Sequence, residues 1–266
     1  MKRFIRFLAA ALIATAPAFA NAGSSAAGKS VQPAAEVAAF ANRVQQDLAS
    51  RGANVAIVAR MGRDPAQMPD GILYTHLGFW VYSTITNADG STGKGYRVYN
   101  LYQQAGDRTR SDLVQDSPAD FFAGAQRLDA GIIIPAAKLQ RKLLSVINSP
   151  TYAALHNPNY SVLANPRSSQ FQNCTEHTLD VLVAAIYDTS DITQIKANIT
   201  AYFQPQIVEV GGMKRALATV ASAALTTQDH GPVIGTATFG SVSRFMTRYN
   251  LTQDVYRMTP TGITRF

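Results

Sequence analysis

Cys174 is the only cysteine among the 266 residues of the chain. It directly precedes an apolar segment with the spacing of a helix core face, which predicts a helix over residues 174–187. The first turn of a helix offers unpaired backbone N–H groups and the positive end of the helix dipole, and both stabilise a thiolate. Since the thiolate is the nucleophilic form of cysteine, this position suits attack on a carbonyl carbon.

His76 is the candidate base for this thiol. An imidazole beside a thiol can take its proton, so a Cys–His pair is the minimal machinery for acyl transfer. His76 lies in an aromatic and β-branched run, residues 72–84, whereas Asn100 lies in a second such run, residues 96–102, with Gln103 just after it. Because a third polar side chain usually orients the imidazole, we expect Asn100 to hold His76, with Gln103 as the substitute. These residues are far apart in the sequence, so their meeting in space is a hypothesis.

Each candidate also has a purely structural interpretation. Cys174 can be a buried, inert thiol, and His76 can be a strand histidine packed between Tyr74 and Phe79. Asn100 can be an ordinary residue of the sheet. The chemical interpretation therefore depends on the distances between these side chains.

The remaining histidines are weaker candidates. His177 lies three residues after Cys174, on roughly the same helix face, and is an alternative base. His156 and His230 lie in expected loops, where we expect them to be solvated. A zinc site built from His76, His177 and Cys174 has suitable ligand types, but the sequence has no paired-ligand spacing to support it. We expect no metal and no cofactor.

The first 22 residues have the features of a secretory signal peptide. A basic start precedes the apolar residues 7–20, and two small-x-small cleavage patterns end at Ala20 and Ala22. Cleavage would lower the formal net charge from +7 to +4, because three basic residues are removed with the peptide. We therefore expect a periplasmic or secreted protein.

Length and composition limit the kinds of protein and of partner that we expect for the mature chain. Its roughly 245 residues suffice for one domain with a full core. The basic residues are scattered and do not alternate with aromatic residues, so we expect no nucleic-acid partner. No apolar run after residue 22 approaches the roughly 20 residues of a transmembrane helix. A single cysteine in an oxidising compartment forms no internal disulfide, and it is either buried and inert or kept for its reactivity.

Hydrophobic periodicity and turn residues predict a mixed α+β protein. The strongest strand pair is residues 72–84 and 96–102, joined by a hairpin turn at Asp89-Gly90 that places His76 opposite a residue near Gln103. Further strands are expected at residues 55–59, 131–134 and 255–258. Helices are expected at residues 33–49, 118–122, 136–147, 174–187, 191–203, 213–225 and 239–249, with a helical turn at residues 152–155.

Two short motifs carry a family resemblance. Residues 75–79 (THLGF) resemble the His-x-Gly strand of circularly permuted NlpC-type, papain-like enzymes, in which the histidine strand precedes the cysteine helix. Residues 173–177 (NCTEH) are similar to the Asn-Cys-Glu-His element of the lecithin:retinol acyltransferase branch of that superfamily. The inserted Thr175 departs from that element, so no role is carried over to His177. Residues 72–186, including the runs LANP (163–166) and FQNC (171–174), are similar to a bacterial family, domain of unknown function 2145.

The resemblance implies a fold and a set of roles. It implies an α+β fold with a permuted papain-like (NlpC-type) core over residues 33–210, in which an antiparallel sheet packs on the cysteine-bearing helix. Residues 23–32 would be a disordered lead-in, and residues 211–266 a helical C-terminal extension of the same domain. Cys174 would be the nucleophile, His76 the general base and Asn100 its orienting group.

The resemblance also implies an oxyanion hole and a reaction class. Backbone N–H groups at the start of the helix, with the Asn173 side chain, would form the hole. We expect an exported cysteine hydrolase that cleaves an amide or an ester through a Cys174 thioester. Export favours a cell-wall peptide as the substrate, and the permuted branch equally allows a lipid or acyl ester. The alternatives are a lipid or acyl-ester transferase, a non-catalytic envelope protein that keeps the fold for binding or assembly, and a redox-sensing thiol.

Overall fold

The computed structural model describes residues 31–86, 89–209 and 223–266. The predicted signal peptide, most of the predicted lead-in and most of the predicted helix 213–225 therefore lie outside the described residues. Of that helix, only the 3₁₀ turn Ala223–Leu225 is described.

A seven-stranded sheet forms the centre of the molecule, and each neighbouring pair of its strands is antiparallel. The two strands next to each other in the middle of the order, β1 and β5, are short, apolar and buried along their whole length, as expected of strands covered on both faces. The strands follow the order β4 (Ser111–Asp116), β3 (Thr92–Gln103), β2 (His76–Thr86), β1 (Val55–Arg60), β5 (Ala130–Pro135), β8 (Thr252–Thr259) and β9 (Gly262–Arg265).

The predicted hairpin is confirmed as β2 and β3. Thr86 pairs with Thr92, and Gly90 between them has a φ of 82°, a conformation that favours glycine. The register pairs Phe79 with Tyr99, and continued to the end of the strand it places His76 opposite Tyr102. The predicted position, near Gln103, is therefore correct to within one residue.

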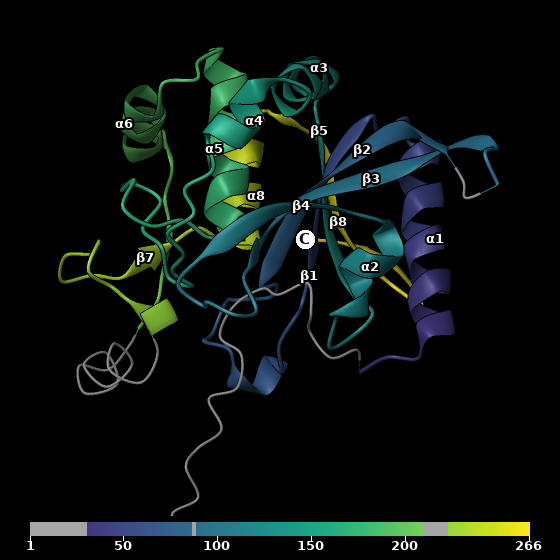
Figure 1. The fold of residues 1–266 in the computed structure, drawn as a ribbon, viewed down its shortest axis with the longest axis horizontal. Coiled ribbons are helices and arrows are strands. Elements are labelled where there is room, and N and C mark those ends of the chain that lie inside the picture. The colour runs from purple at the N-terminus through teal and green to yellow at the C-terminus, as the bar shows by residue number, and fades with distance from the viewer. Residues whose placement is uncertain (1–30, 87–88, 210–222) are drawn as a thin grey trace, which may run out of the picture.

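Helices cover both faces of the sheet (Figure 1). Helices α1 (Ala34–Ser50) and α2 (Pro118–Ala123) lie on one face, where Val44 and Phe122 pack with Trp80 of β2. The other face carries α3 (Ala137–Ile147), α5 (Cys174–Tyr187) and α8 (Phe239–Arg248), with α4 (Pro150–Ala154) and α6 (Ile192–Tyr202) farther out.

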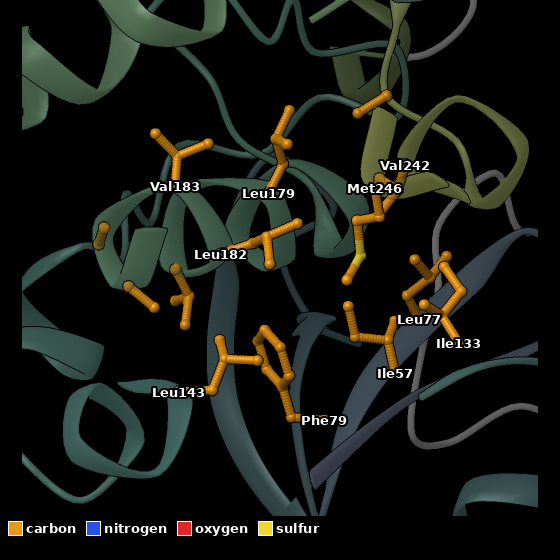
Figure 2. Close-up of a cluster of buried hydrophobic side chains, with 14 of the residues drawn as sticks. Ile57, Leu77, Phe79, Ile133, Leu143, Leu179, Leu182, Val183, Val242 and Met246 are labelled. Carbon is orange, nitrogen blue, oxygen red and sulfur yellow. The ribbon is translucent and has the colours of Figure 1, made fainter. Parts of the chain in front are cut away.

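Helix α5 is the central element of the second layer. Twelve of its residues are buried, so the helix is covered on nearly all sides, as expected of a helix inside a core. Figure 2 shows Leu182 of α5 and Met246 of α8 pointing toward the sheet, where they meet Ile57, Leu77 and Phe79. Burial of each such side chain contributes roughly 1.5–3 kcal/mol, and it fixes the position of the helix that begins at Cys174.

Sequence patterns missed two strands of the sheet. Residues 111–116 (SDLVQD) form the edge strand β4, and residues 262–265 form β9 at the opposite edge. Both contain mainly polar residues, as is common for strands at the edges of a sheet, which pair with a neighbour on one side only. The expected helical C-terminal extension therefore includes strands as well as α8: β8 and β9 complete the main sheet, and β7 (Gly235–Thr236) pairs with β6 (Gln206–Ile207).

Candidate functional site

Helix α5 begins at Cys174, as the sequence predicts, because Asn173 caps it. The Asn173 Oδ1 accepts a hydrogen bond from the Glu176 N–H at 2.9 Å, and the Asn173 Nδ2 donates to the Val162 carbonyl at 3.0 Å. Both ends of the Asn173 amide are thus engaged in holding the helix start. This leaves the backbone N–H groups as the better candidates for an oxyanion hole.

The thiol of Cys174 is buried, with 4% of the residue exposed. Its Sγ lies 3.8 Å from the Thr75 carbonyl oxygen and 3.8 Å from the Thr175 hydroxyl. Leu101 of β3 and Tyr160 pack against it. Thr75 directly precedes His76, so the thiol touches the backbone at the start of the histidine strand.

The predicted pair of His76 and Asn100 is formed. The His76 Nε2 lies 3.2 Å from Asn100 Oδ1, and the Asn100 Nδ2 donates to Asp116 Oδ2 at 3.0 Å. Because this amide donates to a carboxylate, its oxygen faces the ring, and the His76 Nε2 must carry the hydrogen. Tyr102 donates to the same Asp116 oxygen at 2.7 Å, which fixes the carboxylate in turn.

The glycine of the His-x-Gly motif makes room for this pair. A Cβ atom added at Gly78 would lie 2.7 Å from Asn100 Oδ1 and 3.2 Å from the Tyr99 carbonyl oxygen. Gly78 and His76 lie on the same face of β2, so the amide of Asn100 must pass over Gly78 to reach the imidazole. The glycine of the motif is therefore needed because any side chain at this position would collide with the Asn100 amide.

His76 is a neutral imidazole at pH 7. The ring is fully buried, and burial, followed by the nearby Arg60 guanidinium, lowers the pKa of His76 well below its usual value. The hydrogen bond with Asn100 opposes this shift. With Nε2 protonated, the Nδ1 carries the lone pair, and this atom has no hydrogen-bond partner. The Nδ1 is therefore the atom of the ring that can accept a proton, although the lowered pKa makes it a weak acceptor.

Cys174 and His76 approach the end of β2 from opposite faces of the sheet. The His76 ring stacks on Tyr102 at 4.7 Å and lies 5.3 Å from Phe121 of α2. Leu101 points to the opposite face from Tyr102, and Cys174 packs against Leu101. Among the described residues, no hydrogen bond joins the thiol to the imidazole. The structure thus brings His76 and Asn100 together on the α2 face of the sheet and places the thiol on the α5 face, in contact with the Thr75 backbone.

Gln103 and His177, the alternatives to Asn100 and His76, contact other groups. The Gln103 Nε2 donates to the Arg108 carbonyl at 2.6 Å, so Asn100 and not Gln103 orients the imidazole. His177 contacts α4: its Nε2 donates to the Tyr152 carbonyl at 3.3 Å, and its ring meets the Tyr152 ring edge-on. Burial lowers the pKa of His177 to about 3.

The expectation that His156 and His230 are solvated is wrong. Only 1% of the His230 side chain is exposed, and its Nε2 donates to the Leu163 carbonyl at 2.6 Å. His156 is half-buried, and its Nε2 lies 3.0 Å from the Ser111 hydroxyl. Long-range packing of the loops, which local sequence does not encode, covers both rings.

Sequence patterns did not identify Arg63, which lies near the thiol, or Arg108, which lies near Arg63. Arg63 lies within electrostatic range of Cys174, Tyr160 and Arg108, and burial lowers the pKa of Arg63. Arg63 and Arg108 each have a buried Nη2 atom without a hydrogen-bond partner. The available signal was their position: both lie in loops that follow strands, where functional side chains are common.

Within the described ranges, no three His, Cys, Asp or Glu side chains converge to hold a metal ion. No helix of that part of the chain is long and apolar enough to cross a bilayer.

A family model described as "uncharacterized protein conserved in bacteria" (DUF2145) matches residues 47–246. The chain belongs to this family. The match extends from the end of α1 into α8, so the DUF2145 region contains Cys174, His76 and Asn100. No curated protein and no solved structure matches the chain. The predicted membership in DUF2145 is confirmed, and the description of the family names no activity.

Proposed function

We propose that this DUF2145 protein is an exported cysteine hydrolase of the permuted papain-like kind, with Cys174 as nucleophile and His76 as base. One observation carries the proposal: the His76–Asn100 hydrogen bond leaves the His76 Nδ1 unpaired, and the Cys174 thiol contacts the backbone of Thr75, the residue before His76. The chain order, with the histidine strand before the cysteine helix, supports it. So does the packing of α5 on the antiparallel sheet.

The reaction begins with transfer of the thiol proton to the His76 Nδ1. Transfer requires near hydrogen-bond reach. The ring and the thiol lie on opposite faces of the sheet, so the start of β2 must rearrange and bring both groups to one face before the proton moves. The thiolate attacks the substrate carbonyl, and the C–N or C–O bond breaks as the imidazolium protonates the leaving group. Water then hydrolyses the thioester, and Cys174 regains its proton. Backbone N–H groups at the start of α5 stabilise the oxyanion.

Arg63 and Arg108 favour a substrate that carries a carboxylate. Buried guanidinium N–H groups without partners are costly, and a carboxylate would accept from them in a charge-assisted hydrogen bond. Cell-wall peptides carry such groups, whereas neutral lipid esters do not. We therefore favour an amidase or peptidase acting on cell-wall peptides after export, with acyl-ester cleavage as the alternative.

Alkylation of the single cysteine tests the Cys–His pair. Iodoacetamide should label the wild-type protein at neutral pH, and His76→Ala should slow labelling by roughly tenfold or more, because the thiolate loses its proton acceptor. His177→Ala is the matched control, since this histidine is equally buried and contacts α4 instead. In parallel, Cys174→Ser should lose all hydrolysis of muropeptides. Labelling that needs a pH above about 8 and is indifferent to His76→Ala would contradict the pair.

The burial of Cys174 favours a second candidate, a non-catalytic envelope protein that retains the fold. In that case the thiol is a small apolar core residue, and Cys174→Ala should keep the stability and the phenotype of the wild type. A cell-wall phenotype that follows loss of the chain and is fully rescued by Cys174→Ala would establish this candidate against the hydrolase.

A further inference from the structure

A cleft of about 270 Å³ lies between α5, α6 and the loops on either side of residues 159–168. Its walls include the apolar side chains of Leu155, Phe171 and Ile192. Glu176, Asp180 and Lys196 line the same cleft and form its charged part. The cleft residues are distinct from the His76–Asn100 pair, which lies on the opposite face of the sheet.

The charged part contains two carboxylates and one ammonium group. The Lys196 Nζ donates to Glu176 Oε1 at 2.6 Å and to Asp180 Oδ1 at 2.8 Å, and both carboxylates are fully buried. Gln172 donates to Asp180 Oδ2 at 2.9 Å, so both oxygens of Asp180 are paired. The Oε2 of Glu176, in contrast, is buried without a hydrogen-bond partner.

Within the part of the chain that the structure describes, the other groups around Glu176 add no cation to balance the second carboxylate. Asp229 lies within electrostatic range of Glu176 and adds negative charge. His156 lines the cleft, but burial lowers the pKa of His156, so it is neutral at pH 7. Burial raises the pKa of Glu176 well above its usual value, against the effect of Lys196. Without a further partner, Glu176 is therefore either a carboxylate with no cation to balance it or a carboxylic acid whose proton has no acceptor. Each of these states is costly in a buried site.

We propose that this cleft binds a small primary amine, whose ammonium group donates to Glu176 Oε2. The cation balances the second carboxylate and satisfies its unpaired oxygen. A short alkyl stem would lie along Leu155, Phe171 and Ile192, as in other small-molecule sites with an apolar wall and few polar anchors. The site uses neither Cys174 nor His76, although it shares α5 with Cys174.

Calorimetric titration of the full chain with butylammonium tests the site, with butanol and butyrate as neutral and anionic comparators. Butylammonium should bind, and the comparators should not. Affinity should rise with pH, because Glu176, whose pKa is raised by burial, must ionise while the amine keeps its proton up to about pH 10. Glu176→Gln keeps an oxygen for Lys196 and removes the charge, so it should weaken binding roughly tenfold or more. Glu36→Gln on the exposed side of α1 is the matched control.

Ile192→Trp tests the site without disturbing the buried charges, since it fills the cleft from its wall. It should abolish butylammonium binding and leave the thermal midpoint nearly unchanged. Cys174→Ser should bind butylammonium as the wild type does, which separates this site from the proposed catalysis. Equal binding of butanol, wild-type affinity in Ile192→Trp, or no binding of butylammonium at millimolar concentration would overturn the proposal.

Discussion

At the scale of single residues, one side-chain amide connects the candidate site to the sheet. Asn100 accepts from the His76 imidazole and donates to Asp116, so its orientation sets the tautomer of His76. Gly78 permits this arrangement because any side chain there would collide with the Asn100 amide. The fixed tautomer leaves the His76 Nδ1 as the basic atom, which the proposed proton transfer requires.

Gly78→Ala should break the His76–Asn100 hydrogen bond. The added Cβ would lie 2.7 Å from Asn100 Oδ1, so the amide must move and leave the His76 Nε2–H unpaired. We expect a loss of roughly 1–3 kcal/mol in the free energy of unfolding, the cost of an unsatisfied buried donor. Urea unfolding and the ¹⁵N chemical shifts of the His76 ring measure both effects.

Gly93→Ala is the control for that substitution, because a Cβ added at Gly93 of the neighbouring strand meets open space. An unchanged ring spectrum in Gly78→Ala would show that the amide has another route to the imidazole.

At the scale of elements, one buried lysine ties two helices together. Lys196 of α6 binds Glu176 and Asp180, which lie one turn apart on α5. The start of α5 carries Cys174, so this tie also holds the nucleophile in place. Asn173 and Lys196 thus fix the same helix end, one through its cap and the other through its first two turns.

Lys196→Met should destabilise the protein strongly. It keeps the apolar stem but leaves two fully buried carboxylates without their cation, which costs roughly 3–5 kcal/mol in the free energy of unfolding. Lys142→Met is the matched control: its partner Asp188 is 71% exposed, so the loss should be below about 1 kcal/mol. Equal losses of unfolding free energy in the two variants, measured by urea unfolding, would show that burial does not strengthen the ion pairs between α5 and α6.

At the scale of the whole molecule, each of the two helical layers buries a neutral histidine. His76 lies under α2, and His177 lies between α5 and α4. Burial lowers the pKa of both, to about 3 for His177. Below pH 6.5 the unfolded chain therefore binds protons that the folded chain does not, and stability falls as the pH falls. Glu176 acts in the opposite direction, because its pKa is raised.

Comparison of wild type with His177→Gln isolates one of these contributions. The free energy of unfolding of the wild type minus that of His177→Gln should be constant above pH 6.5. Below it, the difference should shrink by about 1.4 kcal/mol per pH unit down to about pH 3, where the folded imidazole also takes up a proton. Urea unfolding at pH 7.5, 6 and 5 measures this, and a difference that does not vary with pH would contradict a buried neutral His177.

Local sequence determined much of the framework of this protein. The start of α5 at Cys174 and the β2–β3 hairpin follow from the apolar spacing of a helix and a turn signal. These features depend on residues close in sequence or on two strands joined by one short turn, so periodicity suffices to predict them. The pairing of His76 with Asn100 was a hypothesis, because the sequence does not fix the register of the two strands.

Only the tertiary structure decided which faces and which loops meet. Successive side chains of a strand point to opposite faces of the sheet. A shift of one residue in the register would therefore turn His76 from α2 toward α5. The approach of Arg63 to Cys174, and of Lys196 to Glu176, depends on packing between segments that are far apart in the chain. The polar edge strands β4 and β9 likewise have no pattern of their own, since their place comes from the neighbour that each pairs with.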